Sequence, residues 1–283
     1  MVALILVAAI CGGGYLIWGT RNPQRTSADL SLTGSSRTDE ALFEVPSLIN
    51  TKRQVSQPRE RYTIDITYPT VGLANHPELA QEANAVISGF IGDLERNFIT
   101  QTKELASPLV PEELTSDLTV RWNALLISPT IISIRFDSSQ YVAGMAHPDS
   151  RTRILNYDLP RHRLLAPLDL FASSTAALPF LSEYTRGALR TRLSDEPEEI
   201  YQSQVIPGTT PTHEHFQEIG ITKEGLLIIF NPYEVAPYAR GTIELPLPIE
   251  VLTDATNTPG LDPDIFSAMT LAEENFREAT PQF

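Results

Sequence analysis

The chain has almost no cysteine and little positive charge, and each shortage excludes a class of function. Cys11 is the single cysteine among 283 residues, so neither an intrachain disulfide nor a cysteine-based metal cluster can form. Lys and Arg together number 21 against 35 Asp and Glu, which gives a formal net charge of -14. Because an acidic chain repels the phosphates of nucleic acids, we expect no nucleic-acid partner.

Motifs of several enzyme classes are also missing. The sequence contains no Gly-x-Ser-x-Gly turn, no phosphate-binding glycine loop, no His-Glu-x-x-His pair and no dinucleotide-binding fingerprint. We therefore expect a protein that is not an enzyme and that holds neither a cofactor nor a metal.

The composition that remains is that of a globular protein with an apolar N-terminal segment. Apolar residues make up 42% and charged residues 20% of the chain, which is typical of a chain that buries a sizeable core. Residues 2–18 are uncharged and mostly apolar, close to the roughly twenty residues that span a bilayer as a helix. The segment 1–19 is either a membrane anchor or an export signal. We favour the anchor, because the apolar pattern resumes after the glycines at 12–14 and ends at Trp18.

Residues 20–61 are predicted to be a flexible linker. They are rich in Ser, Thr, Arg, Gln and Pro, and they show no sustained helical or strand periodicity. One apolar island interrupts this composition at residues 41–49. It is either an extra strand on the domain or a contact for a partner.

From residue 62 on, the patterns predict an α+β fold in which an antiparallel or mixed sheet is covered by a long amphipathic helix and a second helix. Pro69 is expected to end the first strand, because proline lacks the backbone donor of a sheet. We place this N-terminal region at 62–138. Its expected elements are strand 62–68, helix 77–105, and strands 118–126 and 131–136.

The second region, 139–252, is also expected to consist of strands and a helix, but its sequence does not repeat that of the first region. Gly225 suits the positive backbone angle of a tight hairpin, and Asn231 with Pro232 is expected to end the strand that follows. Residues 253–283 are interpreted as an acidic tail that packs weakly. The expected elements are strand 153–159, helix 176–193, the hairpin 216–221 and 226–230, a last strand 242–247 that closes the sheet, and a tail helix 263–278.

Two stretches, 140–171 and 225–241, carry a resemblance to a known family. Their motifs are an aromatic-Gly-Ala-His turn, an Asn-Tyr-Asp strand, a Leu-Asp-Leu-Phe helix start, and a Gly-Leu strand that leads into Pro-Tyr-Glu and Ala-Pro-Tyr. In these motifs and their order the sequence resembles the RsiV/PdaC-like extracytoplasmic domain family, a domain of unknown function that lysozyme-sensing anti-sigma factors and peptidoglycan deacetylases share. The matching residues are Tyr141, Gly144, Ala146, His147, Asn156, Tyr157, Asp158, Leu168, Asp169, Leu170, Phe171, Gly225, Leu226, Phe230, Pro232, Tyr233, Glu234, Ala236, Pro237, Tyr238 and Gly241.

The resemblance implies a location and a kind of ligand. It places the bulk of the chain outside the cytoplasm, although Arg21 and Arg25 after the apolar segment favour the opposite orientation by the positive-inside rule. We expect a membrane-anchored, extracytoplasmic binding domain of the cell envelope, with a lysozyme-like muramidase or peptidoglycan as its ligand. The acidic composition favours the muramidase, because complementary charge accelerates association with a basic protein. One motif departs from the family, since Ala143-Gly144-Met145 stands where paired glycines are usual.

Two alternatives stay open. A peptidoglycan hydrolase or deacetylase would need a catalytic group, and the candidates are His147 with Asp149 and Asp158, or a metal pair at His213 and His215 with Glu214 and Glu218. In each case, ordinary polar residues of a turn or loop are the simpler interpretation. The other alternative is a structural envelope protein without a soluble ligand.

The candidate ligand-binding residues are aromatic, acidic and amide side chains near prolines, a composition that suits a rigid surface for a sugar or for a basic loop of a protein. The competing interpretation is that tyrosine hydroxyls and Asp169 only hold the connection 231–241 in place through backbone hydrogen bonds. The candidates are Tyr141, His147, Asn156, Tyr157, Asp158, Tyr233, Glu234 and Tyr238.

Overall fold

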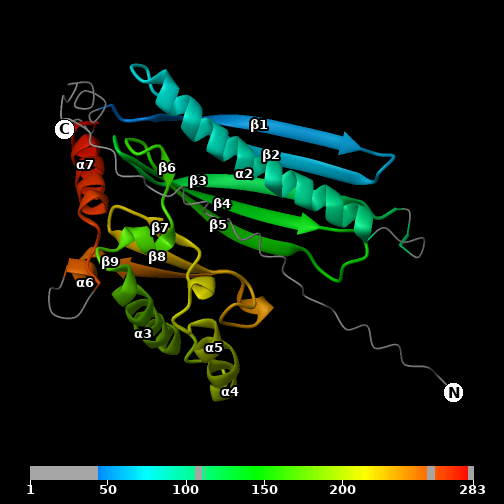
Figure 1. The fold of residues 1–283 in the computed structure, drawn as a ribbon. Helices are drawn as coiled ribbons and strands as arrows, with labels where there is room; N and C mark the ends of the chain where they lie inside the picture. The colour runs from blue at the N-terminus through cyan, green and yellow to red at the C-terminus, as the bar shows by residue number, and fades with distance from the viewer. Residues whose placement is uncertain (1–43, 106–109, 112, 254–258, 280–283) are drawn as a thin grey trace, which may run out of the picture. The chain divides into compact units, whose positions relative to one another are not determined.

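A computed structural model describes residues 44–105, 110–111, 113–253 and 259–279. In this part of the chain the predicted α+β class is confirmed, but the strands form two sheets instead of one (Figure 1). The predicted anchor at 2–18 lies outside the described residues. None of the helices in the described part is both long and apolar enough to cross a membrane.

The larger sheet has six strands in sequence order, and it is mixed. β2 and β3 run parallel, whereas the other neighbours are antiparallel. Helix α2 (Pro77–Glu104) connects the parallel pair, because parallel neighbours need a crossover of this kind. The strands are β1 (Ser47–Gln57), β2 (Tyr62–Gly72), β3 (Ser116–Ile127), β4 (Ile131–Tyr141), β5 (Asp149–Asp158) and β6 (Arg163–Leu164).

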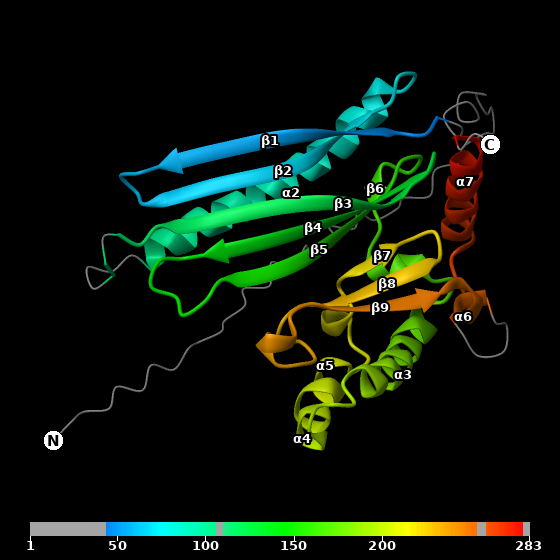
Figure 2. The same ribbon diagram turned by 180° about the vertical axis from the view of Figure 1, so that it is seen from behind.

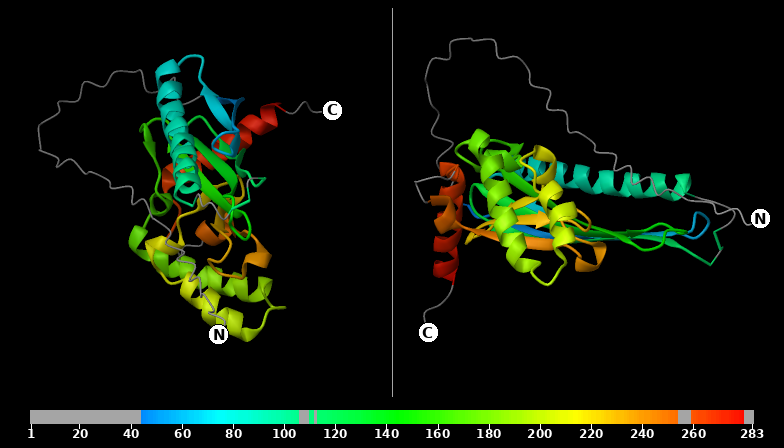
Figure 3. Two further views of the ribbon diagram at one scale, coloured as in Figure 1. Left: turned by 90° about the vertical axis from the view of Figure 1, so that its right-hand side faces the viewer. Right: turned by 90° about the horizontal axis from the view of Figure 1, so that it is seen from below.

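α2 covers one face of this sheet, as its periodicity predicts. The helix lies in front of the strands in Figure 1 and behind them in Figure 2, and Figure 3 shows it running along the sheet. Phe90 packs on Phe136 of β4 with ring centroids 4.9 Å apart. The buried residues of the helix are Ala80, Ala83, Ile87, Ile91 and Phe98, and they share one core with apolar residues of β2 to β5.

Two expectations about the start of the domain are wrong. Within the predicted linker 20–61, β1 pairs with β2 along its whole length. Its side chains are mostly exposed, so the strand lacks the apolar alternation by which sequence reveals a strand. β2 also continues through Pro69 to Gly72, which is tolerated because β3 pairs with β2 only as far as Ile66 and requires no donor from the proline.

The expected boundary between residues 138 and 139 falls inside a strand. β4 continues to Tyr141, and it pairs with β5 from Ile131 to Gln140. These ladder hydrogen bonds hold residues 139–158 in the six-stranded sheet, so no domain begins at 139.

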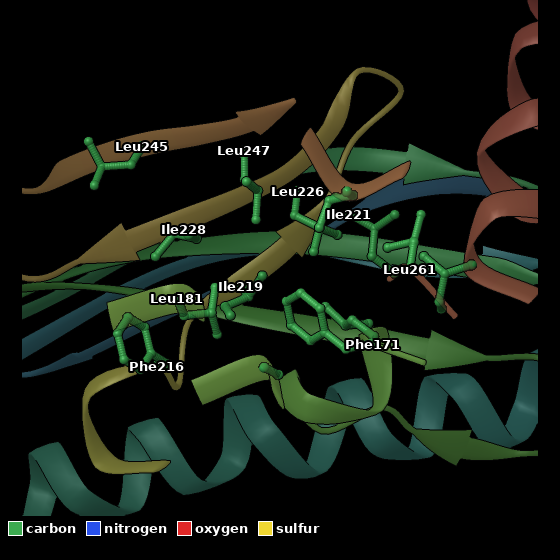
Figure 4. Packing of buried hydrophobic residues seen from close by; sticks show 14 of the residues in the cluster. Phe171, Leu181, Phe216, Ile219, Ile221, Leu226, Ile228, Leu245, Leu247 and Leu261 are labelled. Atoms are coloured by element: carbon green, nitrogen blue, oxygen red, sulfur yellow. The ribbon is translucent and has the colours of Figure 1, made fainter. Parts of the chain in front are cut away.

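The smaller sheet consists of β7 (Ile219–Ile221), β8 (Gly225–Phe230) and β9 (Ile243–Pro248), all antiparallel. The predicted hairpin and the positive φ of Gly225 (145°) are confirmed, but the last strand closes this separate sheet. Helix α3 (Ser174–Arg192) contributes Ala177, Leu181 and Leu189 to its core. Figure 4 shows side chains of β7, β8 and β9 gathered with Phe171, Leu181 and Phe216.

The predicted acidic tail is part of this second core. Helix α7 (Pro263–Ala279) buries Ile265, Ala268 and Met269, and Phe171 bridges to Leu261 just before it. Residues 261–272 of the predicted tail therefore belong to the core and are not a weakly packed appendage. The polar and acidic composition of this segment predicted weak packing. That prediction was wrong because three apolar side chains on one side of a helix are sufficient to bury it against an existing core.

Side chains join the smaller sheet to the open edge of β5. Asn231, which follows β8, accepts from Thr152 N (2.6 Å) and donates to Thr152 O (3.2 Å), as a neighbouring strand would. The Glu218 carboxylate accepts from Ile154 N (2.7 Å) and pairs with Arg153 (2.6 Å). An exposed strand edge is thereby capped by two side chains, which fixes how the smaller sheet meets β5.

Candidate functional site

Three of the predicted ligand-binding side chains come together at the surface. The rings of His147 and Tyr238 have centroids 4.3 Å apart, and Tyr233 lies 5.4 Å from Tyr238 and 6.5 Å from His147. We call His147, Tyr233 and Tyr238 the aromatic triad. His147 lies in the turn after β4, and the two tyrosines lie in the connection between β8 and β9. His147 and Tyr233 are thus in contact although they are 86 positions apart in the sequence (233 − 147 = 86).

Two members of the triad share one acceptor. The Tyr238 hydroxyl donates to the carbonyl oxygen of Pro148 at 2.9 Å, and His147 Nδ1 lies 2.9 Å from the same oxygen. A carbonyl only accepts, so Nδ1 carries the proton and Nε2 of the neutral ring is left as an acceptor. The bond from His147 to a backbone carbonyl matches the simpler interpretation of this histidine in the sequence.

Tyr233 combines strain with exposure. Its φ is 73°, in the left-handed region that a residue with a Cβ rarely adopts, and 62% of the residue is exposed. Such a conformation costs about 1 kcal/mol or more, and it persists only where the surrounding structure imposes it. An exposed aromatic ring held in a strained conformation is typical of a binding surface more than of a core.

The connection that carries Tyr233 and Tyr238 is fastened on several sides. A Cβ at Gly208 would overlap the carbonyl oxygen of Glu234, so the end of the helical segment packs directly on the connection. This segment comprises α4 (Glu198–Ile200), a π-helical turn η2 (Tyr201–Val205) and α5 (Ile206–Gly208). Arg240 pairs with Asp195 at 2.6 Å and also with Glu196, and its bond to Asp195 lowers the pKa of that carboxyl.

Glu234 serves this connection as well. Its carboxylate accepts from Asn231 N at 2.7 Å. Because Asn231 is the residue that pairs with Thr152, the triad is linked through Glu234 and Asn231 to the edge of β5. Asn231, one of the two residues that join the smaller sheet to β5, therefore also helps to position the site.

Part of the chain matches a family of known sequences. Residues 168–250 match the family model described as "Protein of unknown function (DUF3298)". The matched segment contains Tyr233 and Tyr238 and excludes His147, so only part of the triad falls within it. No curated protein matches the chain.

Two solved structures of that family are similar in fold. A member of the DUF3298 family from Bacteroides fragilis has a TM-score of 0.56 and 17% identity, over 81% of this chain and 98% of that one. A DUF3298 family protein from Pseudomonas aeruginosa PAO1 has a TM-score of 0.53 and 14% identity, over 78% of this chain and 96% of that one. At these identities the similarity concerns the fold alone.

The other predicted residues have partners inside the protein. Asn156 accepts from the Ser133 hydroxyl (2.7 Å) and donates to Ile219 O (2.7 Å), so it joins β5 to β7 in the DUF3298 segment. Tyr157 belongs to the core under α2, and burial raises the pKa of its hydroxyl. Tyr141 is half-buried at the end of β4.

Asp158 is the buried last residue of β5. Its carboxylate accepts from the backbone and the guanidinium of Arg161, at 3.0 and 2.8 Å. Arg161 also pairs with Asp264 of α7, so this cluster holds the tail helix in place.

The catalytic set of His147, Asp149 and Asp158 is not assembled. Asp149 and Asp158 are the two ends of β5, and nine residues at about 3.3 Å each separate them by roughly 30 Å. Asp149 instead pairs with Arg151 at 3.1 Å. Asp149 and Asp158 therefore cannot act together on one substrate atom with His147.

The second catalytic set depends on a strand that is not present. His213 and His215 lie in a 3₁₀ turn, so the strand alternation that would have placed both on one face is absent. His215 Nδ1 contacts the Thr210 hydroxyl at 2.7 Å. Glu218 is buried, and burial raises the pKa of its carboxyl. Among the described residues, no group of three or more His, Cys, Asp or Glu is placed to hold a metal ion.

A groove of about 390 Å³ lies away from the triad, between α2 and the hairpin of β1 and β2. Arg53 and Glu95 form an ion pair of 2.9 Å on its wall. Its lining residues are Arg53, Tyr68, Ser88, Ile91, Gly92, Glu95, Arg96 and Ile99.

Sequence reasoning missed the residues that support the triad. Gly208, Asn231 and Arg240 act through contacts with residues distant in sequence, and no local pattern identifies such contacts. Gly208 carried the clearest signal, since a Pro-Gly pair after a helical stretch marks a helix end where a side chain is not tolerated.

Proposed function

We propose that the chain is a membrane-tethered, extracytoplasmic binding domain of the cell envelope without catalytic activity. Its ligand is a lysozyme-like muramidase or peptidoglycan. The observation that carries the binding role is the exposed aromatic triad, held in one geometry by Gly208, Asn231 and Arg240. A rigid surface loses little conformational entropy when it binds, which favours recognition.

Resemblance supports the location. The motifs shared with the RsiV/PdaC-like family include two residues of the triad within the DUF3298 segment, Tyr233 and Tyr238. The apolar residues 2–18 supply a candidate tether. The separation of Asp149 from Asp158, at opposite ends of β5, supports a role in binding over one in hydrolysis.

The first test is calorimetric titration of the full chain with a basic lysozyme and, separately, with soluble peptidoglycan fragments. Each titration is run at low and at physiological salt, because only charge-driven binding weakens as salt is added. Residues before 62 must be kept, since removing them deletes β1 from the sheet. Binding of neither ligand would overturn the proposal.

Localisation needs a separate test. The proposed location is the periplasm or the cell surface, so the test uses spheroplasts, in which only the cytoplasmic membrane still protects proteins. We expect protease added to spheroplasts to degrade the region after residue 44 while the apolar segment stays with the membrane fraction. Protection of that region in spheroplasts, with degradation only after lysis, would contradict the proposed location.

A further inference from the structure

We infer that the aromatic triad recognises an uncharged pyranose ring, so that the glycan strand of the envelope is the ligand and a cationic protein is not. This inference rests on the proposed function and narrows it to one ligand chemistry. It depends on three features of the site: the ring geometry, the state of the nearby carboxylates, and the free acceptor on His147.

The three rings of the aromatic triad lie next to one another at the surface, and we call the surface that they form the aromatic corner. The three centroids lie 4.3, 5.4 and 6.5 Å apart, and the ring planes are inclined to each other by 32° to 37°. Tyr233 and His147 are exposed and Tyr238 is half-buried, so the corner opens to solvent. A pyranose presents a C–H face that packs on an aromatic ring, and it has hydroxyl groups around its rim. The corner therefore offers stacking surface without a deep cavity.

Carboxylates on the segments around the triad already have partners, so they give little support to a lysine or arginine of a guest protein. The pairs are Asp149 with Arg151 (3.1 Å), Asp195 (2.6 Å) and Glu196 with Arg240, and Glu234 with Asn231 N (2.7 Å). A cationic ligand would share a carboxylate that already has a donor, so its gain in charge interaction is reduced, whereas a neutral sugar does not need these carboxylates.

His147 adds a polar contact that suits a hydroxyl. Because its Nδ1 donates to Pro148 O, the Nε2 atom is an acceptor in the neutral form of the ring. A sugar hydroxyl is the matching donor at the rim of a stacked ring. Tyr238 is already committed to Pro148 O at 2.9 Å, so its ring supplies surface while its hydroxyl fixes the loop.

Because Tyr233 has a positive φ, two substitutions at this position separate the effect of the ring on binding from the effect of the backbone strain on stability. Tyr233→Ala removes the ring but keeps a Cβ at φ 73°, whereas Tyr233→Gly removes both the ring and the strain. If the ring binds the sugar, both variants lose binding although Tyr233→Gly is the more stable of the two. Tyr233→Phe keeps the stacking face and is expected to bind as the wild type does.

The experiment is calorimetric titration of the full chain with chitotriose, an uncharged trimer of β-1,4-linked N-acetylglucosamine. We expect the wild type and Tyr233→Phe to bind, with an affinity that does not change between about 0.02 and 0.5 M salt. Tyr233→Ala and Tyr233→Gly are each expected to bind about tenfold more weakly. Phe266→Ala is the matched control, because Phe266 is an aromatic side chain of α7 that is 45% exposed.

Three results would overturn the inference. They are no binding of chitotriose by the wild type, equal losses for Phe266→Ala and Tyr233→Ala, and salt-dependent binding of a basic lysozyme that requires Tyr233 while chitotriose is ignored. The proposed envelope function survives if peptidoglycan fragments or lysozyme still bind, so the two failures are distinguishable. Thermal unfolding of every variant verifies that each one is folded.

Discussion

In the six-stranded sheet, the first residues of β2 alternate between buried and solvent-facing, whereas in the three-stranded sheet β8 is buried at five of its six residues. The larger sheet has one face under α2, and its core is built from α2 and the adjoining strands. The core of the smaller sheet draws on residues from Leu126 to Ala272. A strand with one buried face reveals itself by alternation, but a strand buried on both faces, such as β8, depends on distant parts of the chain.

The position of the aromatic triad depends on contacts between distant parts of the chain. Its tyrosines lie on the connection from β8 to β9, and that connection is fixed by Gly208, Arg240 and Asn231. Changes in the smaller sheet should therefore disturb the site, whereas changes on the exposed surface of the larger sheet should leave it intact.

The largest effect is expected for Gly208→Ala. Its Cβ would overlap Glu234 O, and relieving such an overlap by backbone shifts costs about 3 kcal/mol of unfolding free energy. Gly187→Ala in α3 is the control, because a Cβ there meets nothing within 4 Å. Urea unfolding measures both variants, and equal stability of the two would refute the role given to Gly208.

A smaller effect is expected for Asn231→Ala, which removes both hydrogen bonds to Thr152. Asn231 is 5% exposed, so Thr152 is left with an unpaired buried donor and acceptor, at a cost of about 2 to 3 kcal/mol.

The larger sheet offers the matched comparison for that variant. Asn84 bonds Val71 N (2.7 Å) and Val71 O (2.9 Å) in the same way, but it is only partly buried. We expect Asn84→Ala to cost about 1 kcal/mol, because water replaces part of what is lost. Urea unfolding measures the free energy of unfolding of both variants. A larger decrease for Asn84→Ala than for Asn231→Ala would contradict the expected difference between the two sheets.

The contact between the sheets should also respond to pH through Glu218. Burial raises the pKa of this carboxyl above its ordinary value of 4.5, against the opposing effect of Arg153 and with that of Glu234. Between the unfolded and folded pKa values the folded state binds more protons, so the stability from this group is complete below pH 4.5 and is lost as pH rises through the folded pKa.

Glu218→Gln removes this titration and tests the sign. We expect the wild type to lose stability relative to Glu218→Gln as the pH of urea unfolding is raised above 4.5. Parallel pH profiles of the two proteins would show that Glu218 titrates in the folded state as it does in the unfolded chain.

The smallest effect is expected in the larger sheet's own helix. Gly89 of α2 is exposed, and a Cβ there meets nothing within 4 Å. Gly89→Ala should raise the unfolding free energy by about 0.5 to 1 kcal/mol, since alanine favours the helix. The melting temperature measures this gain, and chitotriose binding by this variant should equal that of the wild type.

The sequence predicted well the elements that carry an apolar pattern or a turn residue of their own. Helix α2 and the hairpin of β3 and β4 follow from apolar spacing, and Gly225 marks the turn before β8. Prediction was wrong for β1, whose side chains are mostly exposed and whose strand state comes from pairing with β2. The tail was misjudged for the opposite reason, because Ile265 and Met269 are buried by a core assembled elsewhere.

For the candidate site, three of the side chains that the sequence proposed lie together in the structure, but the sequence could not group them. Tyr233 and Tyr238 are close in sequence, yet His147 reaches them only because β5 returns beside the smaller sheet. Asn156 and Asp158, proposed alongside them, bond to Ser133 and Arg161 instead. Whether a polar side chain finds an internal partner is decided by folding, since the partner is distant in sequence.

The sequence by itself determined the α+β class, the long helix, the hairpins and the acidic charge, because spacing, turn chemistry and composition are local properties. Only the tertiary structure decided that the strands divide into two sheets, that Asn231 and Glu218 cap β5, and that three rings meet at one corner. Those outcomes depend on contacts between residues tens of positions apart, and their energies exist only once the chain has folded.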